Sequence, residues 1–192
     1  MKQIFLSTLL CLTIGIASKS QILEHSGSTN QKFCGKAVSV YKFANNEING
    51  KTFSFFIPQK GCASLPGFKE LNFDKCDKFT IEFAGYLDAE KKKPSYFLIR
   101  KDGKYLSFKL EGAEFSQRLN NPISQQWVFV KKSTNTYNLI VTFNTMCLYL
   151  NTKVENGKYV MPITNFSVVD ATYNLNIIIK EVNTNAIPSR TQ

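Results

Sequence analysis

The sequence is short of the residues on which many enzymes and metal sites depend. It holds one histidine, His25, and one tryptophan, Trp127, in 192 residues. A single imidazole leaves little for a catalyst that uses a histidine base, or for a site that holds a metal through several histidines. No Cys-x-x-Cys pair, phosphate-binding glycine loop or Gly-x-Ser-x-Gly elbow is present. We therefore expect a non-enzymatic protein with no cofactor and no metal.

Long apolar runs are confined to the N-terminus. Lys2 is followed by an apolar run over residues 4–16, and Gly15 and Ala17 are small residues at the −3 and −1 positions of a cleavage site. This order is typical of a secretory signal peptide, and the run is too short to cross a bilayer. We predict that residues 1–17 are removed, with cleavage as late as Ser20 as the alternative. The mature protein is then secreted and has no membrane span.

In an exported protein the cysteines are expected to form disulfides. Cys11 lies inside the signal peptide, which leaves an even set of four: Cys34, Cys62, Cys76 and Cys147. An even set in an exported chain predicts two disulfides, and three connectivities remain open. Asn165 begins the only Asn-x-Ser/Thr sequence and is the candidate glycosylation site.

The rest of the chain divides into two polar ends and one domain. Residues 18–32 are polar and predict a flexible N-terminal arm, and residues 183–192 predict a flexible tail. Residues 33–182 form a single domain of ordinary size.

This domain is rich in short alternating segments, which predict strands. Residues 37–43 and 52–57 are expected to form a hairpin through the linker 45–50. The strongest hairpin signal is the Asp102-Gly103 pair between residues 96–100 and 104–109. Further strands are expected at 79–83, 127–130, 137–143, 147–150, 158–161, 166–169 and 175–179, with 158–161 following 147–150 across a loop that ends in Asn156-Gly157. The fold class is all-β.

A recurrence suggests how these strands are arranged. Wide hairpins begin near Ala37, Phe97 and Cys147, and each precedes a strand that starts with an aromatic residue, at Phe79, Trp127 and Phe166. Three four-stranded repeats of about 45 residues predict a β-trefoil. The alternative is a lipocalin-like barrel of eight strands.

One motif resembles a known family. Gln125-Gln126-Trp127 is followed, twenty residues after the tryptophan, by Cys147-Leu148. This resembles the Gln-x-Trp element and the later Cys-Leu strand of ricin-B-type β-trefoil lectins. The resemblance implies a trefoil in which Trp127 packs in the core. The family usually has a sugar-binding aspartate two residues beyond the cysteine, and Tyr149 stands there instead.

Positive charge is the remaining signal of function. The formal net charge is +10, and an excess of this kind attracts acidic glycans, anionic membranes and acidic protein surfaces. The trefoil gathers loops at the ends of its barrel, so basic loops can converge into one binding patch. The candidate patch consists of Lys91, Lys92, Lys93, Arg100, Lys101, Lys104, Lys131 and Lys132.

We therefore expect a monomeric, lectin-like protein that binds acidic glycans outside the cell. The first alternative is a secreted effector, cytokine-like ligand or inhibitor that binds another protein through its loops. The second is a lipocalin-like carrier of an apolar small molecule. Nucleic acid is not expected as a partner because the chain is exported.

Overall fold

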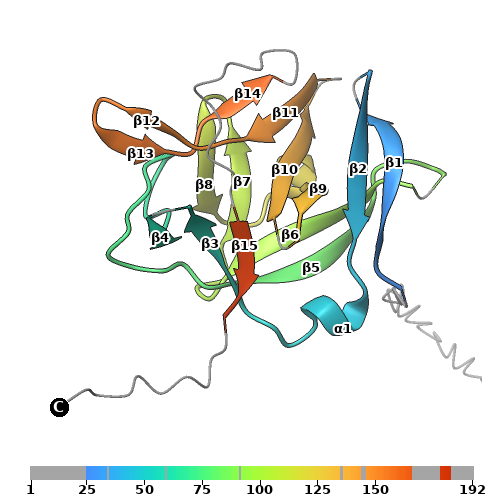
Figure 1. Ribbon diagram of the computed structural model, residues 1–192, viewed down its shortest axis with the longest axis horizontal. Helices are drawn as coiled ribbons and strands as arrows, with labels where there is room; N and C mark the ends of the chain where they lie inside the picture. Colours follow the sequence, from blue (N-terminus) through green and yellow to red (C-terminus); the bar gives the residue numbers. More distant parts are fainter. Residues whose placement is uncertain are drawn as a thin grey trace, which may run out of the picture.

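The computed structural model describes residues 25–33, 35–58, 60–90, 92–134, 136–143, 146–165 and 178–182. These residues form antiparallel strands with one short α-helix and one 3-10 helix, η1 (Figure 1), so the expected all-β class is confirmed. The elements in chain order are β1 (Gly27–Phe33), β2 (Lys36–Lys42), α1 (Asn45–Ile48), β3 (Phe53–Ile57), β4 (Gly61–Ala63), β5 (Phe79–Tyr86), β6 (Pro94–Arg100), β7 (Tyr105–Lys109), β8 (Gly112–Ser116), η1 (Pro122–Gln125), β9 (Val128–Ser133), β10 (Thr136–Phe143), β11 (Met146–Leu150), β12 (Lys153–Glu155), β13 (Lys158–Val160), β14 (Ile163–Asn165) and β15 (Ile178–Glu181).

Six of the strands follow one another around a ring. β3 pairs with β5, β5 with β6, β9 with β10, β10 with β15, and β15 again with β3. The link between β6 and β9 is a bridge between Tyr96 and Trp127, whose backbones exchange two hydrogen bonds of 2.9 Å. The pairing therefore returns to the strand from which it started.

Three arms leave the ring at the carboxyl ends of β3, β6 and β10: the β4 segment, the β7–β8 hairpin and the β11–β14 pair. The arms meet one another through backbone contacts. Lys69 N–H donates to the Ala113 carbonyl at 3.0 Å, Met161 N–H donates to the Lys69 carbonyl at 2.6 Å, and Gly112 is bridged to Pro162. A Cβ atom on Gly112 would lie 2.6 Å from Lys69 Cβ and 3.2 Å from the Met161 carbonyl oxygen. Only glycine fits where the arms converge.

Large aromatic side chains are buried between the strands. Trp127 is fully buried, as expected, and donates its Nε1–H to the Leu106 carbonyl at 2.8 Å. Tyr96 is also fully buried, and its hydroxyl accepts the Phe43 N–H at 2.9 Å. Both polar groups are satisfied, so their burial does not carry the cost of an unpaired donor or acceptor.

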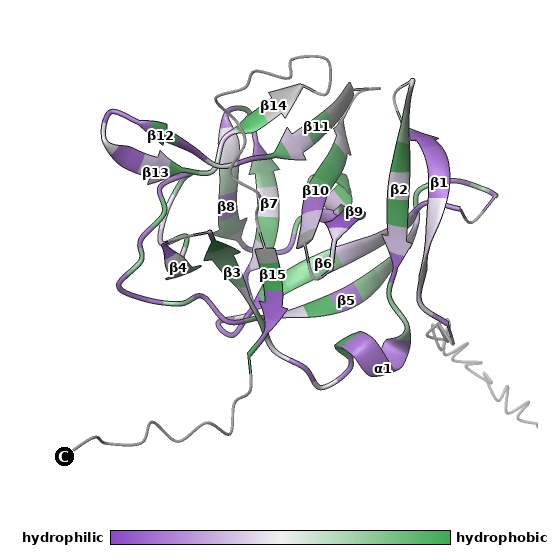
Figure 2. Ribbon diagram, viewed as in Figure 1, coloured by the Kyte–Doolittle hydropathy of each residue, from purple (hydrophilic) through white to green (hydrophobic). Residues whose placement is uncertain are grey.

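The β1–β2 hairpin lies outside the ring and attaches to it through β9. A second, smaller apolar cluster fills the space between hairpin and ring; its buried members are Phe33, Val40, Val128, Val130 and Ile140. Figure 2 shows the contrast between β1, drawn mostly in hydrophilic colours, and β2, which carries hydrophobic bands. Val40 and Tyr41 of β2 are thus buried, whereas β1 is mostly exposed and buries only its last residue, Phe33.

This hairpin corrects two expectations. Residues 27–32 lie in the segment 18–32 that is expected to be a flexible arm, but they belong to β1. Polar side chains on an exposed strand do not show the apolar alternation that marks a buried one. Residues 37–43 pair with β1 and β9 and not with residues 52–57. The linker between the two segments forms α1, which turns the chain away from a hairpin.

A third correction concerns residues 158–160, expected beside residues 147–150. They pair instead with residues 153–155 around Asn156 and Gly157, whose φ angles of 50° and 77° suit a tight hairpin turn. The β6–β7 hairpin at Asp102-Gly103 and the β9–β10 hairpin are confirmed. Residues 1–17, 166–169 and 183–192 lie outside the described residues.

Cys62 and Cys76 form a disulfide with their Cα atoms 5.4 Å apart, so one of the two expected disulfides is confirmed. Cys34 and the side chain of Cys147 lie outside the described residues. So do the side chain of Asn165 and the two residues that complete its sequon. None of the helices in the described ranges is long and apolar enough to cross a membrane.

The convergence of the arms predicts the effect of Gly112→Ala. The added methyl group overlaps Lys69 Cβ and the Met161 carbonyl, so the arms have to separate. We expect a loss of about 1–3 kcal/mol in the free energy of unfolding, measured by chemical denaturation. Gly67→Ala is the control, because no atom lies within 4 Å of the Cβ it would add. Equal effects of the two substitutions would contradict this account of the arms.

Candidate functional site

The structure distributes the predicted basic patch over three places. Lys92 and Lys93 precede β6, whereas Arg100, Lys101 and Lys104 lie at its other end. The length of β6 separates these groups by roughly 20 Å at about 3.3 Å per residue. Lys131 and Lys132 lie at the end of β9, and Lys91 is outside the described residues.

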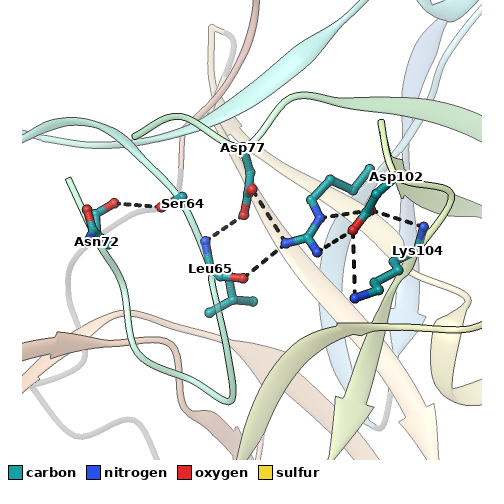
Figure 3. Close-up of polar contacts among 7 residues, drawn as sticks. Ser64, Leu65, Asn72, Asp77, Asp102 and Lys104 are labelled. Carbon is teal, nitrogen blue, oxygen red and sulfur yellow. Dashed lines mark hydrogen bonds and ion pairs between the residues drawn. The ribbon is translucent and has the colours of Figure 1, made fainter. Parts of the chain in front are cut away.

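Arg100 joins two of the arms. Its guanidinium group forms a two-pronged hydrogen bond with Asp102, at 3.0 Å from Nε and 2.7 Å from Nη2. Its Nη1 lies 3.6 Å from Asp77 Oδ1 and donates to the Leu65 carbonyl at 3.4 Å. Asp77 in turn accepts the Leu65 N–H at 2.6 Å. Figure 3 shows Asp77 and Asp102 on opposite sides of the guanidinium group.

The electrostatics agree with this geometry. The hydrogen bond from Arg100 lowers the pKa of Asp102 to about 2, and the Asp102 carboxylate raises the pKa of Arg100. The guanidinium carbon also lies 4.8 Å from the centre of the Phe115 ring. The donors of Arg100 are therefore engaged within the chain, while neighbouring Lys101 is exposed.

A pocket of about 250 Å³ lies at the opposite end of the ring from the arms. We call it the mouth pocket. It is lined by the ends of β3, β9, β10 and β15 together with β2 and α1. Its lining residues are Tyr41, Phe43, Glu47, Lys51, Phe53, Lys131, Thr134, Tyr137, Ile179 and Glu181.

A chain of hydrogen bonds crosses the mouth pocket. The Tyr137 hydroxyl bonds to the Tyr41 hydroxyl, which donates to Glu47 Oε1 at 3.1 Å. The other carboxylate oxygen of Glu47 accepts the Ala44 N–H at 2.8 Å, which fixes Glu47 at the start of α1. Burial is the main cause that raises the pKa of both tyrosines, and nearby Glu47 adds to it. Both hydroxyls are therefore neutral hydrogen-bonding groups at physiological pH.

Two ammonium groups complete the mouth pocket. Lys131 Nζ lies 4.9 Å from the centre of the Tyr41 ring, and Lys51 Nζ lies 2.9 Å from Glu181 Oε2. The pocket thus combines ammonium groups that donate hydrogen bonds and carboxylates that accept them with the aromatic rings of its lining residues. This set suits a compact ligand with many hydroxyl groups. Lys132 follows Lys131 in the chain and is exposed.

A second, wider hollow of about 690 Å³ lies between β1 and the loop before β6. We call it the β1 groove. Its lining residues are Thr29, Asn30, Gln31, Lys32, Asp88, Ala89, Glu90, Lys92 and Lys93.

Side chains hold the two walls of the β1 groove in place. Asp88 Oδ1 accepts the backbone N–H groups of Lys92 and Lys93 at 2.8 and 3.1 Å. Gln31 Nε2 donates to the Lys92 carbonyl across the groove. Lys92 pairs with Glu90, and Lys93 Nζ lies 5.2 Å from the centre of the Phe33 ring.

Sequence reasoning found Lys131 but missed the rest of the mouth pocket. Tyr41 and Tyr137 are 96 positions apart in the sequence, and no local motif marks either of them. Glu47 has a weak local signal, since it stands at the third position of α1, where a carboxylate caps the helix start.

Within the described ranges, no group of three or more histidine, cysteine, aspartate or glutamate residues is arranged to hold a metal ion. A comparison with protein-family models found no match for the chain, and a comparison with curated proteins found none either.

The contacts of Arg100 predict that Arg100→Gln loosens the junction between two arms. Asp77 and Asp102 would each lose the guanidinium group, and we expect a loss of about 1.5–3 kcal/mol in unfolding free energy, the range for hydrogen bonds to charged groups. Because the pKa of Asp102 lies below its unfolded value, the contact contributes fully above about pH 4 and is lost as the pH falls through about 2. Denaturation at pH 7 measures the effect, with Lys101→Gln as the control; equal losses would contradict this role.

The buried tyrosines predict a two-step alkaline titration. Burial raises the pKa of Tyr41, Tyr96, Tyr137 and Tyr149, in the last case to about 12. In the unfolded chain they ionise near pH 10. Their contribution to stability is therefore present below about pH 10 and is lost as the pH rises further. We expect phenolate absorbance to rise first for exposed tyrosines and again on unfolding; Tyr137→Phe should shrink only the second step. A single step near pH 10 with the circular dichroism unchanged would contradict this prediction.

Proposed function

We propose that this protein is an exported, non-enzymatic binding protein on a β-trefoil scaffold, and that its mouth pocket holds one sugar residue of an acidic glycan. The observation that carries the proposal is the convergence of two tyrosine hydroxyls, two carboxylates and two ammonium groups in about 250 Å³ at the open end of the ring.

The strand pairing supports the trefoil. Residues 53–86, 94–133 and 136–181 each begin and end with a strand of the ring, and each places an arm between those two strands. Six ring strands and three converging arms are the parts that a trefoil requires. The β1–β2 hairpin precedes the first unit, and β12–β13 is an addition to the third.

Export has two sources of support. The first seventeen residues have the charge, apolar run and small residues of a signal peptide. The Cys62–Cys76 disulfide is of the kind that persists in oxidising compartments.

The chemistry of the mouth pocket favours binding over catalysis. Its tyrosines are neutral at physiological pH, and Glu47 is engaged by the Ala44 N–H and the Tyr41 hydroxyl. A proton-transfer catalyst needs a group whose pKa lies near the working pH. Hydroxyl groups of a sugar can instead donate to Glu47 and Glu181 and accept from Lys51 and Lys131.

A negative group on the sugar adds a charge-assisted hydrogen bond to Lys131. Lys131 is the more available of the two cations, because Lys51 is already paired with Glu181 at 2.9 Å. The charged groups of the mouth pocket also argue against a carrier of an apolar small molecule. Such a ligand would have to displace water from two ammonium groups and two carboxylates, which costs free energy.

Lys131→Gln and Lys132→Gln provide a matched test. They remove the same charge from adjacent residues, but only Lys131 lines the mouth pocket. We expect Lys131→Gln to elute from immobilised heparin at lower salt and to bind about tenfold more weakly, while Lys132→Gln stays close to the wild type. Lys131→Arg should restore much of the binding, and thermal unfolding should show that all three variants fold.

Two results would contradict the proposal. Equal losses for Lys131→Gln and Lys132→Gln would indicate attraction by overall charge alone. Failure of the wild type to bind heparin, or any acidic glycan on an array, at physiological salt would exclude glycan binding of this kind.

A further inference from the structure

The strand β1 ends the main sheet. It pairs with β2 on one side, and within the described residues no strand pairs with its other side. It is seven residues long, and four of its first five residues are exposed, Gln31 being the exception. Figure 1 shows β1 at the outer edge, next to β2. An exposed edge of this length is a template for another strand.

The hairpin geometry shows which backbone groups face outward. Phe33 pairs with Lys36, so two residues connect the strands of this hairpin. In a two-residue turn this closing pair exchanges its hydrogen bonds inward, and inward and outward residues then alternate. The N–H and C=O groups of Ser28, Asn30 and Lys32 therefore point away from β2.

Natural edge strands are often blocked by proline, by a bulge or by a covering segment. β1 contains no proline, and its register with β2 runs without a shift from Gly27 to Phe33. The strand at the other end of the sheet order, β8, is covered at its start, where Gly112 is bridged to Pro162 and the Ala113 carbonyl accepts the Lys69 N–H. The two end strands of the sheet therefore differ in how far their outer edges are covered.

The β1 groove runs beside this open edge. A strand added to β1 would direct alternate side chains toward the loop wall, where Lys92 and Lys93 lie. Lys32 adds a third cation on β1 itself. The lining of the groove thus holds three lysines against two carboxylates, Asp88 and Glu90, which leaves one excess positive charge. Glu90 is paired with Lys92, so Lys32 and Lys93 are the cations that an acidic strand would meet first.

We infer that the edge of β1 receives an extended, acidic segment of a partner polypeptide as an added strand. Backbone hydrogen bonds to residues 28, 30 and 32 supply the pairing, and the lysines select glutamate or aspartate at alternate positions. This surface is separate from the mouth pocket, so the protein can bind a glycan and a polypeptide at once.

Asn30→Pro is the central test. Proline removes the outward N–H of residue 30 and leaves the bonds between β1 and β2, which edge strands tolerate. The probe is a short fluorescent peptide of alternating valine and glutamate, with the same peptide carrying lysine for glutamate as its control. We expect the acidic peptide to bind and to slow hydrogen exchange at the amides of Asn30 and Lys32. Asn30→Pro should weaken binding by about tenfold or more.

Asn30→Ala is the matched variant, because it removes the same side chain but keeps the backbone N–H. It should bind the acidic peptide like the wild type. Heparin elution should be unchanged in both variants, which separates this inference from the glycan proposal, and thermal unfolding should confirm that Asn30→Pro folds.

Three results would overturn the inference. Equal losses in Asn30→Pro and Asn30→Ala would mean that the side chain, and not the edge, is recognised. Absence of binding by the acidic peptide at low salt would exclude a partner of this chemistry. Concentration-dependent dimers that Asn30→Pro abolishes would assign the edge to a second copy of the chain.

Discussion

The two backbone hydrogen bonds between Tyr96 and Trp127 turn a long antiparallel sheet into a closed ring. Both residues are fully buried, and each anchors a further element: the Tyr96 hydroxyl accepts from Phe43 after β2, and the Trp127 indole donates to Leu106 in β7. Loss of this pair would open the ring and leave large aromatic faces without partners. The chain has 16 phenylalanines and 8 tyrosines, and burial of aromatic side chains contributes strongly to the free energy of folding. Closure of the ring and packing of the aromatic core therefore depend on each other.

Closure gives the molecule two unlike ends. At one end the arms meet around Gly112, and ion pairs such as that of Arg100 with Asp102 lock them together. At the other end the strands of the ring stop around a hollow, and residues of β2 and α1 also line it. Charged side chains pair with one another at both ends, but at the mouth pocket they also line a cavity, and Lys131 there lies over the Tyr41 ring. The same residue types thus hold the scaffold together at one end and are available to a ligand at the other.

Local signals predicted the parts of this fold that depend on neighbours in the sequence. The Asp102-Gly103 turn is of this kind, since a turn needs only its own residues. The burial of Trp127 was implied by the resemblance to the Gln-x-Trp element. The edge strand β1 was missed because polar residues on an open edge carry no hydrophobic period. The mouth pocket was missed for a different reason: Tyr41, Glu47 and Tyr137 meet only once the ring has closed. Arg100 was selected for its charge, but the sequence does not show that Asp77 lies within reach of it.

Net charge therefore says less about function here than the placement of individual cations. Lys51, Lys69, Lys92, Arg100, Lys104, Lys109, Lys153 and Lys158 all have carboxylate partners within 4 Å. The exposed pairs among them, such as Lys92 with Glu90 and Lys158 with Glu70, stabilise the protein little and break easily at a binding surface. Selectivity then has to come from cations that geometry positions and leaves without a carboxylate partner. Within the part of the chain that the structure describes, Lys131 over the Tyr41 ring and Lys93 over the Phe33 ring meet that condition, and each borders one of the two hollows. An aromatic ring can hold an ammonium group in place without neutralising it, which keeps the charge available to an acidic ligand.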